Sequence, residues 1–199
     1  MSLRILFLCF LLLAGAGSAQ AQEGRPASEY ALNISAVYAT QWTVYLITQE
    51  KTIQEHGSWD HFFEYPLHPE FDKDSFDYNL FKHAWAGQYY YLFYRARGYS
   101  ESEAFLWTFL SSLAFEFAIE TYTEKPSIQD IYQTPIFGTL VGMGFERWSL
   151  ALRSQDSSVA HFFGYLLNPF ALFVKDSSFV MIFPQIDPQQ TGLTLSWRY

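Results

Sequence analysis

Three predicted helices carry small or polar residues at every fourth position, and this spacing constrains the fold more than any other feature. Residues four apart lie on one slowly winding ridge of a helix, while the other positions here are rich in Phe, Tyr, Trp and Leu. We therefore expect the rows to face one another inside a bundle whose bulky apolar side chains point outward. The rows are Asn79, His83, Gly87, Tyr91 and Arg95; Thr108, Ser112, Glu116 and Glu120; and Thr134, Gly138, Gly142 and Glu146.

The small residues of these rows predict close helix packing in a membrane-associated bundle. Gly87, Gly138 and Gly142 are the expected packing positions, and the last two match a G-x-x-x-G motif. Lipid does not penalise outward aromatic side chains, so such an inverted bundle suits a membrane environment. The apolar stretch from 104 to 119 would be about 24 Å long, which is short of the ~30 Å hydrocarbon core. We do not predict that it spans a membrane.

The order of predicted elements indicates an all-α fold with a small C-terminal β-hairpin or strand. Helices are expected over 29–49, 75–97, 100–122 and from Pro135 to 153, with a short turn at 59–63 and a final interrupted helix over 161–173. Ser100 and Glu103 form a capping box, and Gly98 stops the preceding helix. Alternation over 193–199 predicts a strand, for which 179–183 could be the hairpin partner. The bundle domain would cover 22–175 and the β tail 176–199.

The sequence predicts a cleaved signal peptide over residues 1–21. Arg4 precedes an apolar stretch, and Ala19-Gln20-Ala21 gives the small-x-small cleavage pattern. Cleavage would leave a chain that starts at Gln22 and lacks cysteine, because Cys9 lies in the removed segment. Export without disulfides favours a bacterial envelope, and we predict the periplasmic face of the outer membrane.

The charge and the aromatic content of the chain disfavour some classes of function and favour others. Twelve basic against 20 acidic residues give a net charge of −8, which disfavours nucleic-acid binding. Aromatic residues make up 20% of the chain, which excludes intrinsic disorder and favours a surface that meets lipid or a partner.

Buried polar groups in the rows are the candidate functional residues. Three interpretations are open: a hydrogen-bonded network that fixes helix register, with Arg95 neutralising a glutamate; an acid–base pair; or a metal held by the histidine and carboxylates, Glu146 included. We favour the network and predict no metal and no cofactor, because no H-E-x-x-H, E-x-x-H or G-x-S-x-G motif is present. The catalytic candidates are His83, Glu116, Glu120 and Asp130. The predicted polar core is Asn79, His83, Arg95, Ser112, Glu116, Glu120, Ser127 and Asp130.

The same residues resemble a bacterial envelope family catalogued as domain of unknown function 3943, over about residues 70–146. The resemblance departs at Ala84, where the family tends to have proline, and at Met143-Gly144, where a glutamate would follow the last glycine. It implies a helical envelope domain, more loosely similar to VanZ-like membrane proteins, and no particular reaction. The matching residues are Asp72-Lys73-Asp74, Asn79, His83, Gly87, Tyr89-Tyr90, Arg95, Gly98-Tyr99-Ser100, Ser112, Glu116, Glu120, Lys125 to Asp130, Thr134-Pro135, Gly138 and Gly142.

Two function classes follow from the sequence. The first is a non-catalytic envelope component that contacts the lipid bilayer and docks onto another outer-membrane protein or a second copy of itself. Its C-terminal strand would offer Leu193, Leu195, Trp197 and Tyr199 to the partner or membrane, unless the segment is an ordinary hairpin packed on the bundle, which is equally open. The second is a membrane-embedded, lipid-acting hydrolase that uses His83 with Glu116 or Glu120. We predict the first class and therefore do not expect the chain to be an enzyme.

Overall fold

The computed structural model describes residues 25–71, 73, 75–175, 178–187 and 190–197. It does not describe the side chains of Tyr78, Asn79 or residues 174–199, and the predicted signal peptide and Tyr199 lie outside the described residues.

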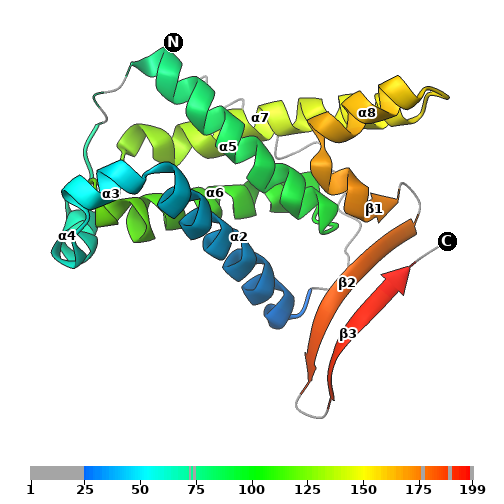
Figure 1. Cartoon of the computed structure of the whole chain (residues 1–199), viewed down its shortest axis with the longest axis horizontal. Helices are drawn as coiled ribbons and strands as arrows, with labels where there is room; N and C mark the ends of the chain where they lie inside the picture. Colours follow the sequence, from blue (N-terminus) through cyan, green and yellow to red (C-terminus); the bar gives the residue numbers. More distant parts are fainter. Residues whose placement is uncertain (1–24, 72, 74, 176–177, 188–189, 198–199) are drawn as a thin grey trace.

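The described part is a helical bundle of seven α-helices, in agreement with the predicted all-α fold (Figure 1). Its elements are α2 (Ala27–Thr48), α3 (Glu50–His56), α4 (Trp59–Glu64), η1 (Tyr65–Leu67), α5 (Phe76–Ala96), α6 (Glu101–Ala118), η2 (Glu120–Tyr122), α7 (Ile128–Arg153), α8 (Ser158–Leu167), η3 (Pro169–Phe173), β1 (Val174–Lys175), β2 (Ser178–Asp187) and β3 (Gln190–Trp197).

Local sequence signals set the main helix boundaries. The predicted capping box is confirmed: the Ser100 hydroxyl accepts from the Glu103 N–H, and the Glu103 carboxylate accepts from the Ser100 N–H. Gly98 has φ +78°, the left-handed conformation that ends a helix at low steric cost, and it separates α5 from α6.

One predicted boundary is wrong. Pro135 does not begin a helix but lies inside α7, which starts at Ile128 after the Ser127 cap. Proline lacks an N–H and disrupts the bond to the carbonyl four residues earlier, yet the helix continues through it. The structure also adds α3, which the sequence analysis does not predict, and ends α6 at Ala118 rather than near Tyr122.

Helices α5 and α7 run in the same overall direction and pack against each other along one contact line, which we call the seam (Figure 1). Its contacts join residues 51 positions apart: His83 with Thr134, Gly87 with Gly138, Tyr91 with Gly142, and Arg95 with Glu146. A Cβ on Gly138 would lie 2.4 Å from the Gly87 Cα, so the two backbones nearly touch at this point. Two of the predicted rows therefore pack against each other in register.

The bundle buries polar residues and exposes large apolar ones. The row residues His83, Thr108, Ser112, Glu116 and Thr134 are all buried. Many Phe, Trp and Leu side chains point outward instead, among them Phe81, which is 75% exposed, and Phe63, which is 73% exposed. The stretch from Glu101 to Tyr122 is the one helical segment in the described residues that is long and apolar enough to cross a membrane, and 39% of its apolar window is buried.

The C-terminal segment adds three antiparallel strands in the order β1-β2-β3, beside one end of the bundle (Figure 1). In the β2–β3 pairing, Val180, Ile182 and Pro184 are partners of Trp197, Leu195 and Leu193, respectively. β3 is thus the last strand of the sheet as described.

Candidate functional site

His83 lies at the centre of the candidate site, at the N-terminal end of the seam. Its side chain is buried. The Nε2 atom lies 3.2 Å from Oδ2 of Asp130, and the Nδ1 atom lies 3.0 Å from Oγ1 of Thr134. Asp130 and Thr134 are one turn apart on α7, so both ring nitrogens of the histidine contact the same helix.

Asp130 is positioned by the first turn of α7. Its backbone N–H donates to the Ser127 hydroxyl, which caps the helix, and its carbonyl accepts from the Ser112 hydroxyl of α6 at 3.4 Å. Its carboxylate is also near the helix N-terminus, where the macrodipole favours negative charge. The cap therefore fixes Asp130 next to His83.

Glu116, on α6, lies close to His83 and Asp130. Its Oε2 accepts a hydrogen bond of 2.9 Å from the backbone N–H of Ser127, and its side chain is almost completely buried. Burial raises the pKa of the Glu116 carboxyl well above its usual value, and the negative charge of nearby Glu120 raises it further. The carboxyl therefore holds a proton more tightly than an exposed glutamate does.

Glu120 lies one turn further, at the start of η2, and is half-buried. Burial raises the pKa of Glu120 to about 7, and the positive charge of Lys82 opposes this shift. The Glu116 and Glu120 carboxyls lie close enough for each to affect the pKa of the other. Two carboxyl groups with raised proton affinity thus lie side by side near His83.

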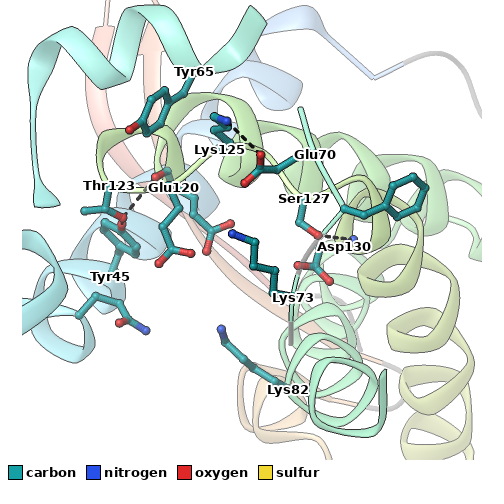
Figure 2. Close-up of a pocket in the computed structure, with 13 residues that line it drawn as sticks. Tyr45, Tyr65, Glu70, Lys73, Lys82, Glu120, Thr123, Lys125, Ser127 and Asp130 are labelled. Carbon is teal, nitrogen blue, oxygen red and sulfur yellow. Dashed lines mark hydrogen bonds and ion pairs between the residues drawn. The ribbon is translucent and has the colours of Figure 1, made fainter. Parts of the chain in front are cut away.

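A pocket of about 550 Å³ opens next to these groups (Figure 2). Asp130, Ser127 and Glu120 line it, and Figure 2 shows the side chains of Lys73 and Lys82 pointing into it. Its lining carries four carboxylates and three lysines, so its charge is close to balanced. The full lining is Tyr45, Gln49, Tyr65, Glu70, Phe71, Lys73, Lys82, Glu120, Thr123, Glu124, Lys125, Ser127 and Asp130.

Arg95 lies at the opposite end of the seam from the other candidates. Its Nε donates to both carboxylate oxygens of Glu146, at 2.9 and 3.0 Å, and the Tyr91 hydroxyl donates to the same carboxylate. The structure thus places the glutamate that Arg95 neutralises outside the cluster of Glu116, Glu120 and Asp130.

The other predicted site residues are distributed as follows. Gly87, Gly138 and Gly142 lie at the seam. Leu193, Leu195 and Trp197 lie in β3, while Tyr199 and the side chain of Asn79 are outside the described part.

Two features of the interior are not among the predicted residues. Thr134 contacts His83, although the sequence analysis treats it only as a row member. Helix α2 adds a fourth buried row, Asn33, Val37, Gln41 and Tyr45, which has the same four-residue spacing and could have been found by it. Gln41 of this row donates to the Ser111 carbonyl of α6.

The cluster offers acid–base and metal-binding chemistry. His83 and Asp130 can exchange a proton over 3.2 Å, and Glu116 is a second buried acid beside them. One ligand atom from each of the three side chains lies within 4.8 Å of the other two. These are donor types that Zn²⁺ and similar ions bind in proteins.

A known protein family matches the part of the chain that contains this cluster. The family model described as "Domain of unknown function (DUF3943)" matches residues 68–170, which include α5, α6, α7 and α8. No curated protein and no solved structure matches the chain significantly. The match confirms the resemblance drawn from the sequence and extends it beyond residue 146. Since it covers more than half of the chain, the protein belongs to the DUF3943 family.

Proposed function

We propose that this protein is a non-catalytic component of the bacterial outer membrane. In this proposal the exported chain lies at the periplasmic face, where its exposed aromatic surface contacts lipid, and it docks onto a larger membrane protein complex. The observation that carries the proposal is the exposure of large apolar side chains around a polar interior.

Helix α8 carries the most concentrated part of this surface. It packs against α7 through small residues: a Cβ on Gly164 would lie 2.6 Å from the Arg153 side chain, and Ala160 is also buried. Its bulky residues face away from the bundle, with Val159, Phe162 and Leu166 all more than 60% exposed. Such a helix is suited to lie at a membrane surface with its apolar face in the lipid.

The apolar surface extends beyond α8 to several other elements. Side chains of this kind are exposed on α2, α4, α5, α6 and α7 as well as in η3. A bilayer can contact apolar side chains without shape complementarity, whereas an interface with one protein partner covers a single patch. The exposed residues outside α8 include Ile47, Trp59, Phe63, Phe81, Trp85, Leu140, Trp148, Leu172 and Phe173.

Binding to vesicles tests the role of α8. Phe162→Asp/Phe163→Asp places two charges on its exposed face and is expected to reduce recovery with phosphatidylethanolamine–phosphatidylglycerol vesicles in a flotation gradient by about tenfold or more. The matched control is Gln54→Asp/Gln155→Asp, which adds the same charge at two exposed polar positions. Equal flotation of the two double variants would contradict lipid contact through α8.

Docking onto a partner is proposed to use β3. This strand pairs with β2 on one side and is the last strand of the sheet as described, so its other edge can extend a partner's sheet. The apolar residues proposed to contact the partner or membrane are Leu193, Leu195, Trp197 and Tyr199.

Deletion of residues 193–199 tests this docking. We expect the truncated chain to lose the proteins that co-purify with the full-length chain from a detergent-solubilised outer-membrane fraction, because the augmenting strand is gone. Flotation with vesicles should remain, since α8 is intact. Unchanged co-purification would argue against docking through the tail.

A second candidate function, lipid hydrolysis, is favoured by one specific observation. The His83–Asp130 pair adjoins a pocket and a buried glutamate, as a general base and its orienting acid would. His83→Asn, Glu116→Gln and Glu120→Gln are the discriminating variants. Loss of phospholipid hydrolysis in variants that remain folded and bound to vesicles would support the enzyme, whereas absence of hydrolysis by the wild-type protein would favour the non-catalytic role.

A further inference from the structure

We propose that His83, Glu116 and Asp130 form a binding site for a divalent transition-metal ion of the zinc type. This site is independent of the proposed membrane docking. The three side chains are buried and come from α5, α6 and α7, respectively, so only the folded bundle brings them together. Each offers one ligand atom within 4.8 Å of the other two.

The distance between His83 and Asp130 already suits a shared ion. Nε2 of His83 and Oδ2 of Asp130 are 3.2 Å apart. Two ligands that each lie about 2.0–2.1 Å from a tetrahedral zinc ion are about 3.3 Å from each other. Glu116 offers an oxygen within 4.8 Å of both atoms and would complete the set by moving its carboxylate towards this pair.

The surroundings of the ligands support the same assignment. In metal sites, the second ring nitrogen of a histidine usually donates to a fixed oxygen, which selects the tautomer and orients the ring. Thr134 Oγ1 lies 3.0 Å from Nδ1 and can accept from the N–H of that nitrogen, which would leave the Nε2 lone pair for the ion. The Ser127 N–H holds one carboxylate oxygen of Glu116 in the same way.

Charge and access also favour a cation at this position. The carboxyl groups of Glu116 and Asp130 lie close to one histidine, and a dication would offset the negative charge that two ionised carboxylates concentrate there. Asp130 also lines the pocket, which provides an entry path and room for a water molecule as a fourth ligand (Figure 2). The set contains nitrogen and oxygen but no sulfur, which favours Zn²⁺, Co²⁺ or Mn²⁺ over Cu⁺.

The competing occupant is a proton shared between His83 and Asp130, and a cobalt titration distinguishes the two. The full chain, purified in detergent without an affinity tag and treated with a chelator, is titrated with Co²⁺ and its visible absorption recorded. We expect one equivalent of Co²⁺ to give an absorption band that Zn²⁺ abolishes. Absence of the band would overturn the proposal and leave the proton as the occupant.

Single-residue variants test whether the three proposed ligands bind the ion. His83→Gln, Asp130→Asn and Glu116→Gln are expected to weaken Co²⁺ binding by more than about tenfold, and Thr134→Val by about tenfold through loss of ring orientation. The matched controls are Glu146→Gln, at the other end of the seam, and His161→Gln, an exposed histidine. Binding that is weakened equally in the controls, or unchanged in all three ligand variants, would refute the site.

A measurement on the wild-type protein makes the test independent of whether the variants fold. X-ray absorption of the zinc-loaded chain should show one imidazole and otherwise oxygen ligands in the first coordination sphere. A spectrum with no imidazole, or with two or more, would overturn the assignment to His83, Glu116 and Asp130.

Discussion

At one end of the seam Arg95 forms an ion pair with Glu146, whereas at the other end His83 faces Asp130 with Glu116 alongside. The Arg95 end is balanced, since one guanidinium meets one carboxylate and the Tyr91 hydroxyl adds a further donor. The His83 end groups several carboxyl groups around one histidine and adjoins the pocket.

This difference indicates which end serves packing alone. Both ends lie on the same two helices and have the same offset of 51 positions, so the packing does not require different charge arrangements. Burial of a charged carboxylate costs free energy, which either protonation or a bound cation offsets. The contrast therefore agrees with the proposed ion at the His83 end and with a stabilising ion pair at the Arg95 end.

The largest effect is expected from breaking the seam between its two ends. Gly138→Ala would place a Cβ 2.4 Å from the Gly87 Cα, and because backbone cannot rotate away, we expect a loss of about 3 kcal/mol or more in the free energy of unfolding. Gly144→Ala on the same helix is the control, since its Cβ meets no atom within 4 Å. It should be neutral or stabilising by up to ~1 kcal/mol in denaturant unfolding. Equal effects would contradict a tight crossing.

An intermediate effect is expected at the balanced end. Glu146→Gln removes the charge that Arg95 and Tyr91 contact and leaves a half-buried guanidinium without its counterion, which should cost about 2 kcal/mol in denaturant unfolding. Glu101→Gln is the control, because this exposed residue is 3.8 Å from Arg147 and should change stability by less than about 0.5 kcal/mol. A cost at Glu146 no greater than at Glu101 would remove the contrast between the ends.

The smallest effect on stability is expected from a glutamate-to-glutamine change at the His83 end of the seam. Glu116→Gln keeps an oxygen that can accept from the Ser127 N–H and removes a charge that repels Glu120. In chelator-treated protein we expect stability to change by no more than about 1 kcal/mol, in the stabilising direction. A loss as large as that of Glu146→Gln would show that the two ends have the same structural role.

Sequence reasoning identified the interior because a four-residue spacing places residues on one helix ridge whatever the tertiary structure. That spacing brought out His83 and Glu116, and the capping box located the start of α6. The sequence separation of 51 between contacting residues of α5 and α7 could not be predicted, because it depends on the direction in which the two helices pack.

Asp130 is a predicted candidate, but the sequence does not place it on the same helix row as Thr134. Asp130 lies four residues before Thr134 and so continues the row of α7, whereas Pro135 predicts a helix start that excludes it. Proline is favoured in the first turn of a helix, which is why the local reading was wrong here. The buried row of α2 was missed for a different reason: its Asn33, Val37, Gln41 and Tyr45 are not a uniformly small or charged set.

The parallel direction of α5 and α7 has a consequence for the order of folding. Neighbouring helices, such as α5 and α6, can pair after closure of a short connection, but every seam contact must close a loop of about 50 residues. We expect the seam to form after the barrier to folding, so that seam variants accelerate unfolding and leave the folding rate nearly unchanged. Stopped-flow kinetics of Glu146→Gln would show this, and a slowed folding rate would place the seam in the nucleus instead.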